Sequence, residues 1–259
     1  MNRHWLSYFR ANQTEPGEIP WDHAQAPPQG IARFLIPSLQ QFQLGEGASG
    51  VTFLELGRRH AVVSGDQDFG LDLCEALALF IGEEQRHSRM LCRYLRSMGA
   101  PLLEKHWMDK MFRRTRKLAG LECMVTVLVI AEIMAVPYYA AVHRISACPV
   151  LRAICVRILR EEAQHLRFQA STLRSLQKHR SIIFIALTRT FQRVLLLATC
   201  ALLWIEHGQV LRAGGFTALS LAAKCRGLLA NLQQDSSREK TFAPQLLPAQ
   251  IHTRNLPRV

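Results

Sequence analysis

Apolar residues recur every three or four positions along four segments of this chain, and an acidic residue stands inside each apolar stripe. Such spacing places side chains on one face of an α-helix that packs against other helices. Within residues 68–97, a glutamate and a histidine occupy stripe positions where leucine would be ordinary. The stripe consists of Leu73, Leu77, Phe80, Glu84, His87 and Leu91. Because an ionised carboxylate in an apolar core is costly unless it is paired or metal-bound, the fold must bring compensating groups to it.

The other three stripes carry similar residues. The segment near 149–178 repeats the Glu-x-x-His pattern with Glu162 and His165. Glu132 lies in the stripe of a third segment, inside the run VLVIAEIMAV, and Glu46 lies in the stripe of the first. Residues 83–97 also align with residues 161–175, so the chain contains two related helical hairpins. Each hairpin contributes one glutamate and one Glu-x-x-His pair.

The four stripe glutamates are predicted to meet at one height. In an antiparallel hairpin, residues equally distant from the turn lie level, because each helix rises about 1.5 Å per residue. The midpoint between the two glutamates is Gly65 in the first hairpin and Ala147 in the second, and both fall in turn-like segments. Glu55 and Glu122 fail this test. Glu83 and Glu161, which precede the stripe positions, are expected to face outward or to support the ligands from behind.

The helical spacing and the turn residues predict an all-α chain. Helices are expected near residues 31–62, 68–97, 116–145, 149–178, 181–212 and 216–233. Two hairpins with a long crossover, here the basic link 98–115, are the layout of one kind of four-helix bundle. The predicted organisation is an irregular N-terminal arm (1–30), the bundle (31–178), additional C-terminal helices (179–233) and a flexible tail (234–259).

Four carboxylates and two imidazoles suit a pair of first-row metal ions, most naturally iron, with manganese or a mixed Mn/Fe pair as the alternative. The predicted metal ligands are Glu46, Glu84, His87, Glu132, Glu162 and His165. Their order resembles that of the ferritin-like di-iron carboxylate proteins: Glu, Glu-x-x-His, Glu, Glu-x-x-His. The resemblance covers about residues 31–178 and implies a ferritin-like bundle. It also implies bridging roles for Glu84 and Glu162, and more terminal roles for Glu46 and Glu132.

The same resemblance implies a reaction. The chain has additional helices beyond the bundle, which suit a substrate pocket or a partner surface. The resemblance therefore implies an O₂-dependent oxidase or oxygenase, which needs a substrate and an external electron donor. The chain has no C-x-x-C motif, which argues against a rubredoxin-like module. Iron oxidation or storage, and peroxide reduction, stay open as alternatives. A helical interaction or membrane-surface protein without metal is another, because Arg189 and Arg193 interrupt an apolar segment.

The stretch Gly45–Gly50 fits the G-x-G-x-x-G fingerprint of dinucleotide-binding loops. That loop must follow a strand and open a helix within a βαβ unit. The preceding residues, SLQQFQL, contain no β-branched residue, and no later segments supply a parallel sheet. The informative residue of this stretch is therefore Glu46.

Charge and cysteine usage bear on partners and compartment. The net charge of +12 favours an anionic partner, such as an acidic carrier protein, nucleic acid or a membrane surface, and a homodimer is left open. Seven scattered cysteines indicate free thiols and a cytoplasmic location, with attachment to the membrane periphery as an alternative. The N-terminus has no apolar leader region, and the longest apolar run, Val194–Ile205, suits a buried or interfacial helix. His207 is expected at a helix end or the surface.

Overall fold

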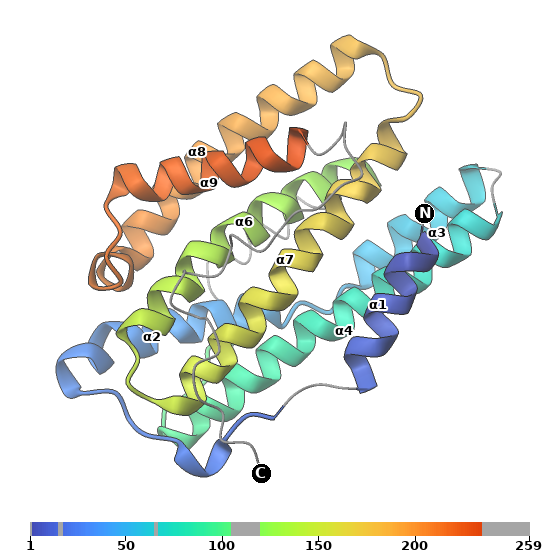
Figure 1. Cartoon of the computed structure of the whole chain (residues 1–259). Helices are drawn as coiled ribbons and strands as arrows, with labels where there is room; N and C mark the ends of the chain where they lie inside the picture. Colours follow the sequence, from blue (N-terminus) through green and yellow to red (C-terminus); the bar gives the residue numbers. More distant parts are fainter. Residues whose placement is uncertain (1, 15–17, 65–66, 105–119, 235–259) are drawn as a thin grey trace, which may run out of the picture.

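The computed structural model describes residues 2–14, 18–64, 67–104 and 120–234, and most of these residues are helical (Figure 1). No strand occurs in these ranges, so the predicted all-α class is confirmed. Most of the predicted crossover and the predicted C-terminal tail from residue 235 onward lie outside the described residues.

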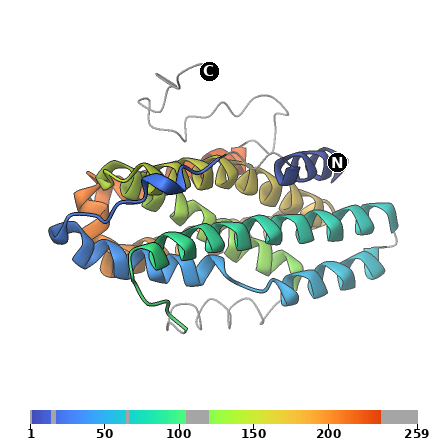
Figure 2. The ribbon, with the colours of Figure 1, turned by 90° about the horizontal axis from the view of Figure 1, so that it is seen from below.

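The helices that carry the acidic stripes form two packed pairs. In the first pair, α2 (Gln29–Glu46) and α3 (Val51–Ser64) follow one another along α4 (Gln67–Ser97). In the second, α6 (Leu121–Ile145) packs along α7 (Pro149–Gln177). The pairs face each other through contacts of α4 with α7 and of α3 with α6 (Figure 2). The space between the pairs is where the acidic stripes converge.

Two further helices cover the second pair. The helix α8 (Ile182–Ala213) packs against α6, and α9 (Ala218–Gln234) packs against α8 and α6 (Figure 1). The start of α8 is fixed by Ser181, whose hydroxyl accepts a hydrogen bond from the Phe184 N–H at 3.2 Å. Pro149 occupies the first turn of α7, where its missing N–H costs nothing. These boundaries match the predicted helices closely.

The N-terminal arm differs from its prediction, because residues Asn2–Thr14 form a helix, α1. Trp5, Leu6 and Phe9 are buried, and the Phe9 ring lies 5.2 Å from that of Phe168 on α7. These side chains bury enough apolar surface against α4 and α7 to hold a short helix that would be marginal alone. The 3₁₀ turn η1 (Trp21–His23) follows before α2.

The prediction of one continuous helix near residues 31–62 is wrong, because this segment forms two helices. Its continuity ends directly after Glu46, and residues 47–50 connect α2 to α3. Gly50 has φ of +67°, a left-handed conformation that side chains disfavour. A Cβ at this position would also lie 2.5 Å from the Ile81 side chain. Glycine is therefore required where the chain passes close to α4, and the helix breaks there.

Within the part of the chain that the structure describes, two helices, α6 and α8, are long and apolar enough to cross a bilayer by length and composition. In α6 the most apolar stretch is 89% buried within the protein, as expected for the central helix of a helical core. In α8 the corresponding share is 44%, because one face of the helix lies against α6 and the other is exposed. Among the described helices, α8 therefore presents the main apolar surface to the surroundings.

Candidate metal centre

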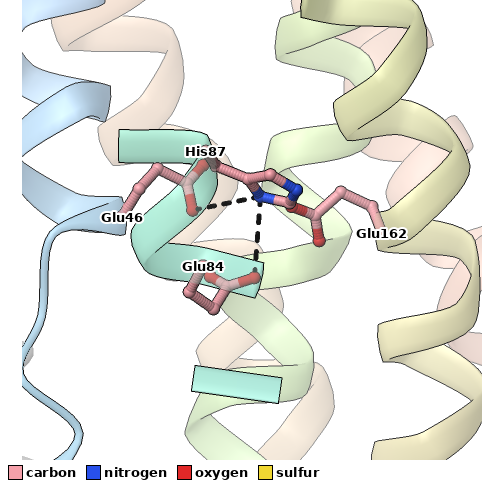
Figure 3. A group of neighbouring side chains, drawn as sticks. All are labelled: Glu46, Glu84, His87 and Glu162. Carbon is pink, nitrogen blue, oxygen red and sulfur yellow. Dashed lines mark ion pairs between the residues drawn. The ribbon is translucent and has the colours of Figure 1, made fainter. Parts of the chain in front are cut away.

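The structure brings together all six side chains that the stripes predicted. One ligand atom each from Glu46, Glu84, His87 and Glu162 lies within 4.8 Å of the others (Figure 3). A second group with the same spacing consists of Glu84, Glu132, Glu162 and His165. Glu84 and Glu162 belong to both groups. The expectation that the four stripe glutamates meet is confirmed.

The inward nitrogens of the two histidines lie among carboxylate oxygens. His87 Nδ1 is 3.6 Å from Glu162 Oε1, 3.7 Å from Glu84 Oε1 and 3.9 Å from Glu46 Oε2. His165 Nδ1 is 2.9 Å from Glu84 Oε1 and 3.7 Å from Glu162 Oε2. All but the shortest of these distances exceed a hydrogen bond and leave room for a cation between nitrogen and oxygen.

The outward nitrogens of the same histidines are held by the glutamates that precede the stripe positions. His87 Nε2 lies 2.6 Å from Glu161 Oε2, and His165 Nε2 lies 2.9 Å from Glu83 Oε2. Each contact crosses from one hairpin to the other. Glu83 and Glu161 are therefore buried supports for the ligands, and the alternative that they face outward is wrong.

A carboxylate on Nε2 places the proton there, which leaves the lone pair of Nδ1 directed at the centre of the cluster. Asn12 Nδ2 from α1 donates to Glu83 Oε1 at 2.6 Å and to Glu161 Oε1 at 2.9 Å. Arg86 also pairs with both carboxylates, at 3.4 and 2.8 Å, and Arg157 pairs with Glu161. The charges behind the histidines are thus compensated before any metal is considered.

Two further polar residues orient the remaining glutamates. The Tyr139 hydroxyl donates to Glu46 Oε1 at 2.7 Å, and Gln169 Nε2 donates to Glu132 Oε1 at 2.9 Å. Tyr139 follows Glu132 by seven residues and Gln169 follows Glu162 by seven, so each shares a helix face with a glutamate of the cluster. Asn12 lies in the arm that was predicted to be irregular. Gln169 and Asn12 carry no charge that would have distinguished them in the sequence.

The atoms that point into the cluster lack partners in regular hydrogen-bond geometry among the described residues. They are Glu84 Oε1, His87 Nδ1, both carboxylate oxygens of Glu162 and His165 Nδ1. Buried polar atoms normally have hydrogen-bond partners, so a group of buried atoms without them indicates a place for an ion or for water. The donor set of carboxylates and imidazoles fits a first-row divalent metal, so the cluster could hold metal ions.

Proton affinities in the cluster are shifted in the direction expected for crowded buried carboxylates. Burial, together with the charges of Glu132 and Glu46, raises the pKa of Glu84 well above its usual value. Burial and the nearby Glu132 and Glu84 raise the pKa of Glu162 in the same way. Burial alone would lower the pKa of His165, but its glutamate neighbours outweigh burial and raise it.

Glu161 shows the opposite behaviour. Burial acts to raise its pKa, but the hydrogen bond and charge of His87, with Arg86 and Asn12, lower it well below the usual range. The surroundings of Glu161 thus favour its charged form behind the site, whereas those of Glu84 and Glu162 favour their protonated forms in the absence of metal.

The residues that the height argument rejected lie elsewhere. Glu55 is exposed and pairs with Arg59 on the same helix, and Glu122 bonds to Gln177 and Arg180. His207 contradicts its prediction: it is buried, and its Nδ1 lies 2.8 Å from the Ser38 hydroxyl.

Comparison of the chain with protein-family models, with curated proteins and with solved structures finds no match.

Proposed function

We propose that this chain is a ferritin-like di-iron carboxylate protein that uses O₂ to oxidise a bound substrate. The observation that carries the proposal is that two ligand groups share Glu84 and Glu162, an arrangement suited to two ions joined by carboxylates. The packing of two antiparallel hairpins, with one Glu and one Glu-x-x-His on each, supports the ferritin-like assignment. Iron is the favoured metal, with manganese or a mixed pair as the alternative.

The residues divide into complementary roles. Glu46 and His87 would hold one ion, Glu132 and His165 the other, and the two shared glutamates would contact both. The carboxylates behind the histidines keep each Nδ1 lone pair directed inward, which raises ligand basicity and fixes the ring. The chemistry that such a metal pair would supply is electron transfer to O₂, for which an external electron donor would be needed.

Iron oxidation or storage, and peroxide reduction, are the alternatives that use the same ligands. A cavity lined mainly by apolar side chains touches three of the ligand glutamates, which favours oxidation of an organic molecule. A storage protein would accumulate many iron ions per chain in large assemblies, whereas the proposed enzyme would stop at the number its cluster holds.

The test is to load the protein with Fe(II) in oxygen-free buffer, add O₂, and record dissolved oxygen together with the optical spectrum. We expect oxygen consumption in proportion to bound iron, followed by renewed consumption only when a reductant is added. Glu132→Ala should lose both iron and oxygen consumption, and Glu55→Ala, its exposed control, should keep both. Stable iron binding without oxygen consumption would overturn the proposed reaction, and continued iron uptake would indicate storage.

The exposed face of α8 favours a second proposal, that the protein binds an anionic lipid bilayer. Ile182, Ile183 and Leu187 are 86%, 73% and 64% exposed, and further apolar side chains continue along the helix. Arg189 and Arg193 are exposed on the same stretch, and the sequence has no acidic residue from 163 to 205. An apolar helix face bordered by arginines suits the interface between head groups and acyl chains.

A further inference from the structure

A cavity of about 370 Å³ lies beside the metal ligands. Glu46, Glu84 and Glu132 form part of its wall, and Gly45 and Ser49, both exposed, line it near the link between α2 and α3. Its volume falls within the range of about 300–1,000 Å³ that is typical of small-molecule sites. The cavity therefore joins the surroundings to one side of the cluster.

The rest of the wall is mainly apolar. Aromatic, aliphatic and thioether side chains come from α2, α3, α4, α6 and α8, and they include Phe42, Phe53, Phe80, Ile81, Met134 and Leu203. Such a wall stabilises a ligand by removing its apolar surface from water, at about 25 cal/mol per Å². The ligand that gains most from this wall is one whose surface is mainly hydrocarbon.

Charged ligands are disfavoured by what the wall lacks. Among the described residues that line the cavity there is no lysine and no arginine. A carboxylate, sulfonate or phosphate would lose its hydration without gaining a cationic partner. In an apolar site this loss costs roughly several kcal/mol. The three glutamates on the wall offer no positive charge to offset this cost.

The metal-loaded cluster would not favour a charged ligand of either sign. Four carboxylates contribute four negative charges to the cluster, and two divalent ions would contribute four positive charges. The loaded cluster is then close to neutral, so it attracts neither a cationic nor an anionic ligand strongly. A neutral molecule is the only class that loses no favourable hydration of charge on entering.

We propose that the substrate that occupies this cavity is a neutral, mainly hydrocarbon molecule. The proposal rests on the proposed function for the statement that this ligand is oxidised, and on the cavity alone for the chemistry of the ligand. Besides the three glutamates, the polar side chains on the cavity wall are those of Gln41, Ser49, Thr52, Thr199 and His207.

The mouth of the cavity provides variants that change access without touching the metal ligands. A Cβ added at Gly45 would meet nothing within 4 Å, so a larger side chain there can extend into the opening without displacing the core. Ala48 lines the cavity from the link between α2 and α3. Gly227 on α9 also has space for a Cβ, is exposed, and does not line the cavity, so it serves as the control.

The experiment titrates the iron-loaded protein with two fluorescent probes that share one ring skeleton. N-phenyl-1-naphthylamine is neutral, and 8-anilinonaphthalene-1-sulfonate carries an added sulfonate. We expect the neutral probe to bind saturably at one site, at least about tenfold more tightly than the sulfonate. Gly45→Phe and Ala48→Phe should each weaken the neutral probe about tenfold or more, and Gly227→Phe should leave it unchanged.

Iron content and helicity measured on the same samples separate the two proposals. Equal or tighter binding of the sulfonate, or neutral-probe binding that neither mouth variant weakens in folded protein, overturns the proposal for the cavity. Selective binding of the neutral probe by protein that takes up no iron supports the apolar cavity and overturns the proposed function. Selective binding of the neutral probe that weakens in both mouth variants, while these variants retain their iron, supports both the cavity proposal and the proposed function.

Discussion

Each histidine of the cluster is held from behind by a glutamate of the other hairpin, and this exchange follows the internal repeat of the sequence. Glu83 and His87 on α4 correspond to Glu161 and His165 on α7, and each glutamate bonds the histidine of the opposite helix. The repeat therefore has a physical meaning beyond duplication. The two halves of the site orient one another, and neither hairpin would hold its histidine in place alone.

Replacing Glu161 by glutamine tests this orienting role. Glu161→Gln removes the charge that fixes the proton on His87 Nε2 and leaves Arg86 and Arg157 less compensated. We expect metal affinity to fall about 10–100-fold with the helical fold retained. The control variant, Glu75→Gln on α4, alters an exposed pair with Arg10 and should leave the affinity unchanged. Titration with Fe(II) under anaerobic conditions measures both, and equal affinities would contradict the role.

The raised pKa values of Glu84 and Glu162 predict how pH changes stability. Because these carboxyls hold protons in the folded, metal-free protein at pH values where the unfolded chain has lost them, their contribution to stability is lost as pH rises above 4.5. Metal binding needs the deprotonated forms and becomes stronger over the same range. The gap in melting temperature between loaded and metal-free protein should widen from about pH 5 to about pH 8. A gap that narrows would contradict this.

At the residue scale, the sequence was sufficient to predict which acids and histidines converge, and insufficient to predict which side chains support them. Acids and imidazoles in an apolar stripe are conspicuous because burial penalises them, and all six came together as predicted. Asn12 and Gln169 are uncharged and ordinary in composition, so their roles become visible only when α1 and α7 are placed. His207 was misjudged because its partner Ser38 lies far away in the chain.

Among the helices, α1 makes a contribution that composition concealed. Its apolar residues are few and lie in a region rich in polar residues and prolines, yet Phe9 is completely buried and its ring lies 6.2 Å from that of His165. The same helix supplies Asn12 to the carboxylates behind the histidines. Its residues pack against α4 and against Phe168 of α7, contacts that local spacing alone does not reveal.

The packing of α1 can be measured through Phe9. Phe9→Ala should lower the free energy of unfolding by about 3–5 kcal/mol, since it removes a fully buried ring and leaves a cavity. Arg10→Ala on the same helix breaks only an exposed pair and should change stability by about 1 kcal/mol or less. Urea denaturation followed by circular dichroism gives both values. Equal losses in the two variants would show that α1 does not pack as described.

The break after Glu46 shows the limit of periodicity as a guide to helix continuity. The apolar stripe continues across the break, with Leu39 before it and Phe53 after it both buried, so a single helix was predicted. What the stripe does not convey is the close approach of Gly50 to Ile81, which only glycine tolerates. The break leaves Glu46 at a helix end, beside the opening of the cavity.

For the whole molecule, the distribution of charge and apolar surface predicts where it docks. Vesicles that contain anionic phosphatidylglycerol should bind the protein, and neutral phosphatidylcholine vesicles should bind it less. The double variant Ile183→Ser with Leu187→Ser should reduce binding at least about tenfold, because it removes two exposed apolar side chains. The matched variant Val62→Ser with Val63→Ser, exposed on α3, should not.

Vesicle co-sedimentation and size measurement distinguish the outcomes. Equal binding by the two double variants, or no binding to anionic vesicles, contradicts bilayer docking through α8. A dimer in solution that the α8 variant dissociates would show instead that a second copy covers this face.

The most direct measurement for the whole account is the metal content of the purified protein, determined by native mass spectrometry together with elemental analysis. The two ligand groups predict about two iron ions per chain, or two manganese or one of each. Glu162→Ala, which alters the residue common to both groups, should remove both ions, and Glu55→Ala should remove neither. A chain that binds no metal, or keeps both ions in the Glu162 variant, would contradict the account.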